Sequence, residues 1–171
     1  ERTIITVTAD AAALKITASG GTPNVITNFT MRGLTFRAGI AITGAIVEID
    51  YLDLPCWSIS DVTVRTNGFA VGTGFYLLDC QNGQVNNLTA RGGTGSDIFT
   101  TGLLIHADDG NQRGNITFLG GLLNGCQSAN HTKVLDTGAN FTRASNTGGI
   151  HDFDFTALVT DNRTVDVTSS A

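Results

Sequence analysis

The sequence predicts an all-β protein that folds as a parallel β-helix, a solenoid of about five to six coils with three short strands per coil. The first observation is a recurring phrase in which a turn residue opens a strand of alternating apolar and polar residues. Its copies are Asn28–Arg32, Asp61–Arg65 and Asn87–Arg91, with weaker copies at Asn115–Phe118 and Asp152–Thr156. The second observation is a glycine-led apolar phrase at Gly44–Glu48, Gly74–Leu78 and Gly102–His106. Strand-type repetition at a period of about 20–50 residues is typical of solenoids.

The composition fits this class. The chain has 171 residues, 21 glycines and only two prolines, and no stretch places apolar residues at helical spacing. No run approaches the roughly 18–20 apolar residues of a membrane span, so we expect no membrane insertion. The net charge is −5 and the basic residues are spread singly, which argues against nucleic acid as a partner.

The repeats divide the chain into coils within one β-helix domain over residues 1–171. Because the chain begins with Glu1 and not with methionine, we expect a piece of a longer protein. Residues 1–25 are predicted to form an incomplete first coil with strands at Thr3–Thr8 and Leu14–Ala18. The regular coils are predicted to occupy residues 26–151 in four copies, 26–56, 57–86, 87–114 and 115–151, and the last coil 152–171. A short apolar piece is expected in each regular coil, at Leu34–Phe36, Phe69–Val71, Ile98–Phe99 and Leu122–Leu123.

Alternation along the turn-opened strands assigns their faces. The inward residues are predicted to be Phe29/Met31, Val62/Val64, Leu88/Ala90, Ile116/Phe118 and Phe153/Phe155, stacked coil upon coil. One coil cannot bury its own apolar face, whereas several stacked coils can. A β-sandwich also has short alternating strands, but the long period and the recurring register favour the solenoid.

The polar faces of these strands predict two outward ladders, Thr30/Thr63/Thr89 and Arg32/Arg65/Arg91. Three stacked guanidinium groups repel each other unless an anion lies beside them. That anion could be a carboxylate of this chain, a neighbouring subunit or a bound acidic sugar; alternatively, the arginines splay into water. Arg32, Arg65 and Arg91 are therefore candidate substrate-binding residues.

The glycine-led strands predict an apolar outer surface. Their outward columns would be Ile46/Tyr76/Leu104 and Glu48/Leu78/His106. A contiguous apolar outer patch usually marks an interface, so we expect a homotrimer of parallel solenoids that buries Ile46, Tyr76, Leu78 and Leu104. The alternative is that corner loops of the same chain cover the patch.

Clustered acids are the candidates for chemistry, because glycosidic hydrolysis needs a pair of carboxyl groups. Glu48, Asp50 and Asp108 are the candidate catalytic residues, and His106 and Asp109 are candidate substrate-binding residues. Aligned by the glycine phrase, Asp50 and Asp108 share one column with Cys80 between them, about 9–10 Å apart. Acids at strand ends also serve as turn formers, which is the competing interpretation. No metal or cofactor motif is present. The corner Asp108–Asn111 could hold a calcium ion, but it lacks the tandem repeats of calcium-bound rolls, so we expect neither a metal nor a cofactor.

The stretch from about residue 26 to 123 resembles the single-stranded right-handed β-helices of the pectate-lyase-like superfamily, phage tailspike and tail-fibre proteins in particular. The residues that carry the resemblance are Thr73–Cys80, Val85–Thr89, Gly102–Ile105 and Gly114–Phe118. The resemblance implies a trimeric protein of the virion tail or extracellular space that recognises, or also degrades, bacterial surface polysaccharide. Any enzyme of this kind would be a polysaccharide depolymerase, a glycoside hydrolase or a lyase. The alternatives are a stand-alone carbohydrate-active enzyme and a purely structural fibre segment.

Overall fold

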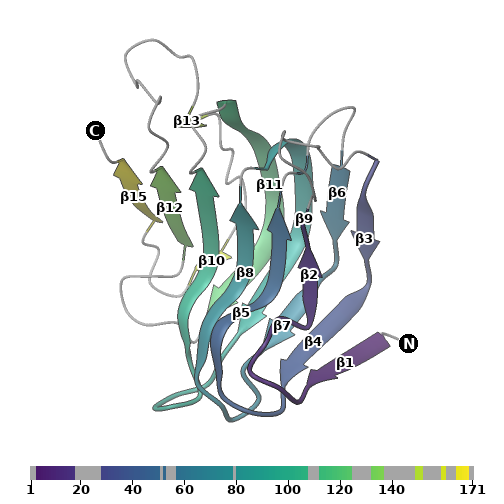
Figure 1. Ribbon diagram of the computed structural model, residues 1–171, viewed down its shortest axis with the longest axis vertical. Coiled ribbons are helices and arrows are strands. Elements are labelled where there is room, and N and C mark those ends of the chain that lie inside the picture. Colours follow the sequence, from purple (N-terminus) through teal and green to yellow (C-terminus); the bar gives the residue numbers. More distant parts are fainter. Residues whose placement is uncertain are drawn as a thin grey trace.

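The computed structural model describes residues 3–17, 28–50, 52, 57–78, 80–107, 112–124, 132–136, 149–151, 159–160 and 165–169. These residues form strands and no helix (Figure 1). The first eight strands are β1 (Thr3–Val7), β2 (Leu14–Ile16), β3 (Thr30–Arg32), β4 (Leu34–Ala38), β5 (Ile42–Asp50), β6 (Trp57–Ser60), β7 (Thr63–Arg65) and β8 (Val71–Leu78). The others are β9 (Gln81–Arg91), β10 (Phe99–Ala107), β11 (Gln112–Asn124), β12 (Thr132–Asp136), β13 (Gly149–His151), β14 (Val159–Thr160) and β15 (Val165–Ser169). Within this part of the chain, no helix is long and apolar enough to cross a membrane.

The strands form two parallel sheets that face each other, which confirms the predicted parallel β-solenoid (Figure 1). We call the sheet with the order β1-β4-β7-β9-β11-β13 sheet A, to which β3, β6 and β14 also belong. The sheet with the order β15-β12-β10-β8-β5-β2 is sheet B. The chain passes from one sheet to the other and back, so each strand pairs with its equivalent in the next turn and not with its neighbour in sequence. A parallel strand needs such a long connection before it can pair.

The number of turns is smaller than predicted. The solenoid has about three turns and not five to six. They correspond to β3-β4-β5, β6-β7-β8 and β9-β10, and β1 and β2 precede them, paired with β4 and β5. The predicted coils beyond residue 114 are described mainly as strand pairings.

Each turn contributes to two sheets, and the first two turns have three strands each. In the second turn they are not the three predicted ones, because β6 was not expected and the predicted piece Phe69–Val71 overlaps β8 only at Val71. The third turn joins two of these strands into one, because β9 pairs with both β6 and β7. The predicted coil boundary at Asn87 therefore falls inside a continuous strand.

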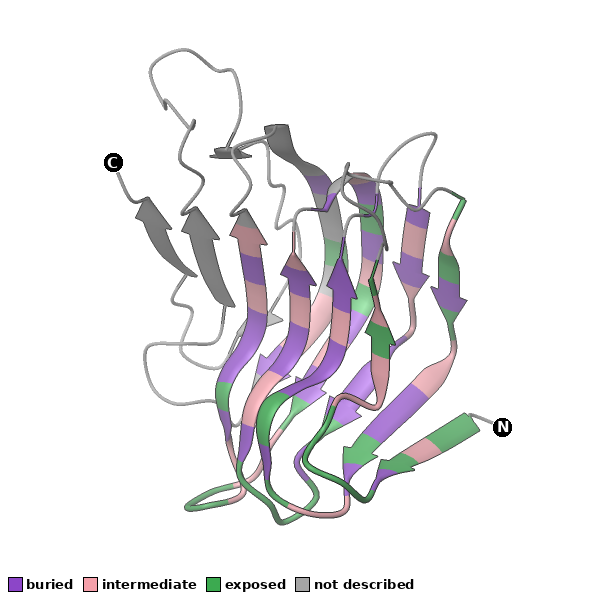
Figure 2. Cartoon of the chain, viewed as in Figure 1, coloured by how far each residue is buried: buried purple, intermediate pink, exposed green. Residues whose placement is uncertain are grey.

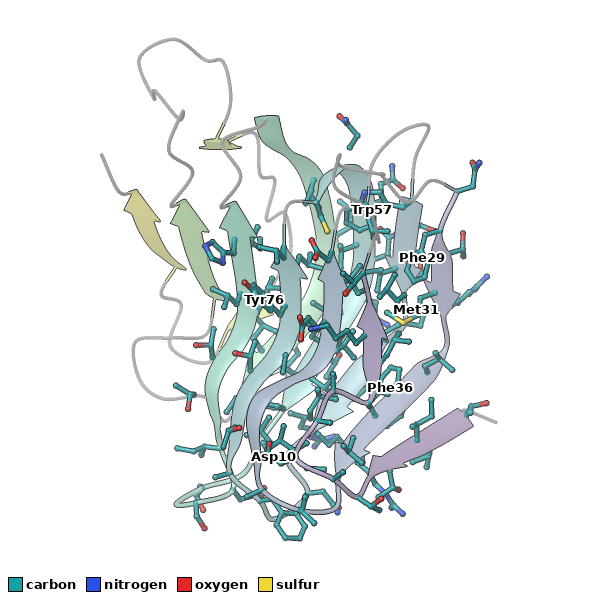
Figure 3. All side chains as sticks on the ribbon, viewed as in Figure 1. Asp10, Phe29, Met31, Phe36, Trp57 and Tyr76 are labelled. Carbon is teal, nitrogen blue, oxygen red and sulfur yellow. The ribbon has the colours of Figure 1, made fainter. Side chains whose placement is uncertain are left out.

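The core lies between the two sheets (Figure 2). In sheet A, Phe36, Val64 and Ala90 stack in register and are buried. In sheet B, two further buried columns are Val47/Phe75/Leu103 and Ile49/Leu77/Ile105. Figure 3 labels Met31, Phe36 and Trp57 among these core side chains. The predicted inward residues Met31, Val62, Val64, Leu88, Ala90 and Ile116 are confirmed as buried, and Phe29 packs at the margin of the core. The side chains of Phe118, Phe153 and Phe155 lie outside the described residues.

Residues in the left-handed region mark where sheet A bends. Asp61 and Asn87 have φ angles of 55° and 53°, and Gly33, which precedes β4 at the equivalent place, has a φ of 69°. Asn28, with a φ of 56°, opens the strand before this bend, and Asn82, with a φ of 58°, takes that position two turns later. Asparagine, aspartate and glycine tolerate this backbone conformation better than other residues. The structural equivalent of Asp61 and Asn87 is therefore Gly33 and not Asn28.

Candidate functional site

An arginine ladder runs across the outer face of sheet A. Arg37 pairs with Arg65 and Arg65 with Arg91, in three consecutive strands. All three side chains are exposed, and neighbouring strands are about 4.8 Å apart. Arg37 is further held by a hydrogen bond from its Nε to Thr6 Oγ1 at 2.7 Å. We call these three residues the arginine ladder.

The predicted place of Arg32 in this ladder is wrong. Arg32 lies in β3 and pairs with Ser60 of β6, on the part of sheet A that precedes the bend. Its Nε lies 3.6 Å from Asp61 Oδ2, so it has a carboxylate of its own chain. The signal for Arg37 is present in the sequence: Leu34–Arg37 follows the pattern Leu/Val-Thr-apolar-Arg, as do Val62–Arg65 and Leu88–Arg91. The copy that begins at Asn28 belongs to the preceding strand of the same turn.

The threonine ladder needs the same correction. Thr35, and not Thr30, pairs with Thr63, which pairs with Thr89. This column lies two residues before the arginine ladder on each strand, and therefore on the same face of the sheet. Thr35 and Thr63 are buried and Thr89 is half-buried. The arginine ladder is thus bordered on one side by short, closely stacked threonines that leave the guanidinium groups accessible.

The electrostatics of the arginine ladder are those of an unneutralised row of cations. Among the described residues, the carboxylates within 4.0 Å of a basic side chain are Asp61, beside Arg32, and Glu48, beside Lys15. No described carboxylate pairs with the arginine ladder. Guanidinium groups in adjacent strands therefore repel each other through water, and an anion placed along them would relieve that repulsion.

The outer face of sheet B is more polar than predicted. Two outward columns cross it: Lys15, Glu48, Tyr76 and Leu104 form one, and Asp50, Leu78 and His106 form the other. The register between β5 and β8 is two residues away from the alignment predicted by the glycine phrase, because Gly74 aligns with Gly102 but not with Gly44. An irregularity between Ile42 and Ala45 accompanies this register.

The predicted outward position of Ile46 is wrong. Ile46 is 0% exposed and belongs to the hydrophobic core. The segment between β1 and β2 lies alongside β5 here. Asp10 accepts hydrogen bonds from the Thr43 amide at 2.7 Å and from Thr43 Oγ1, and the Ala13 amide donates to the Ile46 carbonyl. Glu48 takes the place beside Tyr76 that had been predicted for Ile46. The apolar patch is therefore reduced to the half-buried Tyr76, Leu78 and Leu104.

Tyr76 and His106 form a pair on this face. The Tyr76 hydroxyl and His106 Nδ1 share a hydrogen bond at 2.6 Å, and the two rings are nearly parallel with centroids 6.0 Å apart. Both side chains are half-buried, and Tyr76 is labelled on β8 in Figure 3. His106 is thus held by a specific contact with the preceding turn of the solenoid.

The candidate catalytic acids are only partly brought together. Glu48 Oε1 lies 2.7 Å from Lys15 Nζ. The hydrogen bond and the charge of Glu48 raise the pKa of Lys15, and the charge of Asp50 adds to this effect. Asp50 is 7% exposed and lies two residues further along the same face of β5. Asp50 aligns with Leu78 and then with His106, so the predicted column of Asp50, Cys80 and Asp108 is wrong.

Asp108 and Asp109 lie outside the described residues. Within the described part of the chain, no group of three or more His, Cys, Asp or Glu side chains is arranged to hold a metal ion.

Comparisons of the chain with models of known protein families, with curated proteins and with solved structures found no match. The fold and the surface together define the class of protein: a parallel β-solenoid whose described outer faces carry an arginine ladder on one sheet and a mixed acidic, aromatic and aliphatic surface on the other.

Proposed function

We propose that this β-solenoid is a segment of a phage tailspike or tail-fibre type protein and binds an acidic bacterial surface polysaccharide through the arginine ladder. The observation that supports the proposal is the register of Arg37, Arg65 and Arg91 on adjacent strands of an exposed sheet face, with no described carboxylate beside them. The proposal also accounts for a net negative protein that still concentrates positive charge in one row.

The geometry of the row suits a linear polyanion. The spacing of about 4.8 Å between strands is comparable to the length of one sugar unit, so an extended chain lying along the solenoid axis can offer one anion per arginine. A guanidinium group can hold a carboxylate with two parallel hydrogen bonds. One exposed pair contributes only about 0–1 kcal/mol, but linked contacts on one chain reinforce each other. Binding of this kind is weak per site and strongly dependent on salt.

We propose further that the protein acts at the virion tail or outside the cell as a homotrimer. The support is the half-buried group Tyr76, Leu78 and Leu104 on the outer face of sheet B, where a neighbouring solenoid could complete the burial. Light scattering at several protein concentrations tests this part separately. A species that stays monomeric at high concentration contradicts the trimer and leaves the glycan proposal unaffected.

Cleavage of the bound glycan is a second candidate function. Glu48 and Asp50 lie on one face of β5 two residues apart, a separation of about 7 Å along the strand. Residues with this spacing on one face of a strand can place their carboxyl groups about 6.5–9.5 Å apart, as inverting glycosidases require. The ion pair of Glu48 with Lys15 counts against a free acid at this position. Incubation with capsular and O-antigen polysaccharides, followed by assays for reducing ends and for unsaturated uronate absorbance, separates a depolymerase from a binding module.

The binding proposal is tested with polygalacturonate, a linear polymer with one carboxylate per sugar, and with neutral dextran as the comparison. We expect the wild-type protein to bind polygalacturonate at low ionic strength and to release it near about 0.5 M salt, where the screening length falls to a few ångströms. The combined variant Arg37→Gln, Arg65→Gln, Arg91→Gln should lose this binding. Arg32→Gln is the matched control, because Arg32 is also exposed but lies outside the arginine ladder.

The outcomes of this test are distinct. Unchanged binding by the triple variant would show that the arginine ladder is not the site. Failure of the wild-type protein to bind polygalacturonate or any member of a panel of acidic capsular polysaccharides would leave the structural fibre segment as the better explanation. Thermal unfolding of each variant verifies that the solenoid is intact.

A further inference from the structure

A tight turn follows the central residue of the arginine ladder. Thr66 comes directly after Arg65, and the Phe69 amide donates to the Thr66 carbonyl at 3.1 Å. The two residues between them, Asn67 and Gly68, have φ angles of 52° and 94°. Two consecutive positive φ values and this hydrogen bond define a type I′ turn. The turn brings the backbone of Phe69 back to that of Thr66, the residue next to Arg65.

Neighbouring turns of the solenoid hold this turn on both sides. Asp97 Oδ1, in the next turn, accepts hydrogen bonds from Thr66 Oγ1 at 2.5 Å and from the Gly68 amide at 2.6 Å. Asn67 Nδ2 donates to the Ala38 carbonyl of the preceding turn at 3.1 Å. The segment is therefore exposed to solvent but fixed in conformation, because its polar groups are bound to turns above and below.

The side chain that this fixed turn presents is aromatic. Phe69 is 36% exposed, and the residues around it from 67 to 70 are exposed as well. The sequence predicts that Phe69 begins a short apolar piece of the coil, but β8 begins two residues later, at Val71. A single exposed apolar residue needs no explanation by itself. Here, however, the backbone that carries this ring is held in a fixed turn, four residues after the central arginine of the ladder.

We propose that Phe69 is the sugar-recognising residue of the arginine ladder and that its ring packs against the apolar C–H face of a pyranose unit. The inference rests on the proposed function and adds a basis for specificity. The arginine ladder alone binds any linear polyanion of suitable spacing, because charge attraction does not recognise the backbone that carries the charges. An aromatic surface beside it distinguishes a polymer of sugar rings from other polyanions by burying apolar area. Since the backbone of the turn is already fixed, little backbone freedom is lost when the ring is covered.

The test compares two probes of similar charge: polygalacturonate, which has sugar rings, and polyglutamate, which has none. Phe69→Ala is expected to lower the affinity for polygalacturonate about five- to tenfold, consistent with loss of the apolar contact of a partly exposed ring. The same variant should bind polyglutamate like the wild-type protein. Phe69→Leu, which keeps an apolar side chain but removes the flat ring, should also be weakened for polygalacturonate, and Phe69→Tyr should retain binding. Leu119→Ala is the control for loss of an exposed apolar side chain elsewhere, since Leu119 is 42% exposed in β11.

Failure of this inference and failure of the proposed function give different results. If Phe69→Ala binds polygalacturonate as tightly as the wild-type protein, or loses both probes equally, Phe69 does not recognise sugar. In either case Arg65→Gln still weakens both probes if the arginine ladder is the site. If Arg65→Gln changes neither probe, the proposed function itself fails, and the role of Phe69 fails with it.

Discussion

Replacing the central residue of the arginine ladder should stabilise the free protein and weaken its binding. Arg65 has a guanidinium neighbour on each side, Arg37 and Arg91. Two unit charges about 4.8 Å apart repel by about 0.9 kcal/mol in water, so Arg65 contributes about 1.7 kcal/mol of repulsion without salt. Screening at about 0.15 M salt, and the freedom of the side chains to splay, reduce this to about 0.5–1 kcal/mol. Arg65→Gln removes the repulsion and keeps most of the side-chain stem.

The assay is thermal unfolding followed by circular dichroism at several salt concentrations. For a chain of this size, about 0.5–1 kcal/mol corresponds to a Tm increase of about 1–4 °C. The increase should grow as the salt concentration is lowered and vanish near about 1 M, where the screening length is about 3 Å. Arg32→Gln is the control: it removes an ion pair with Asp61, so its Tm should stay the same or fall slightly.

The same variant should bind polygalacturonate about five- to tenfold more weakly at low ionic strength, because it loses a charge-assisted contact. The essential result is that Arg65→Gln raises the stability of the protein and lowers its affinity for polygalacturonate. A residue that serves the fold would lower stability when replaced, and a residue without a role would change neither quantity. A Tm that falls in Arg65→Gln, or rises by the same amount in Arg32→Gln, would refute the electrostatic reasoning.

Two further predictions concern the fold and its dependence on pH. Gly83→Ala should lower the free energy of unfolding by about 2–3 kcal/mol in urea titrations, because the added methyl group would collide with the buried ring of Trp57. Gly44→Ala is the control and should be nearly neutral, because a methyl group at Gly44 would enter open space. Glu48 raises the pKa of Lys15 above its ordinary value of 10.5, so the stability from this pair is present below that pH and is lost as the pH rises through the pKa of the folded state. In urea titrations, the excess stability of the wild-type protein over Lys15→Met should therefore be constant from about pH 8 to 10 and shrink above 10.5; an excess that grows above this pH would contradict the assigned ion pair.

Much of the fold could be predicted because packing imposes the pattern on the sequence. Val64 and Ala90 are inward because each follows a turn residue by three positions and alternates with a polar residue. Gly74 and Gly102 occupy equivalent positions, since a side chain at Gly74 would collide with the Gly102 carbonyl of the next turn. Such positions recur at every turn, and their spacing in the sequence is enough to align them.

The register of the first turn could not be predicted in the same way, because two strands in it have similar sequences. Phe29–Arg32 and Leu34–Arg37 both end in arginine and both alternate, but only the second follows the bend at Gly33. In sheet B, the irregularity between Ile42 and Ala45 shifts the alignment of β5 with β8. The pattern of apolar residues in the sequence does not reveal this shift. Register in a parallel sheet depends on turn geometry as well as on alternation.

Folding of this solenoid restricts the inward positions of its strands and leaves the outward positions largely free. An inward position such as Val64 must be apolar, because it fills the space between the sheets. The outward position at Arg65 makes no such demand, and threonine or serine would satisfy it without repulsion. Three arginines in consecutive strands therefore oppose the stability of the free protein to a small extent. Departures from local consistency of this kind are expected at functional sites, and the arginine ladder is the place on the described surface where the sequence makes such a departure in every turn.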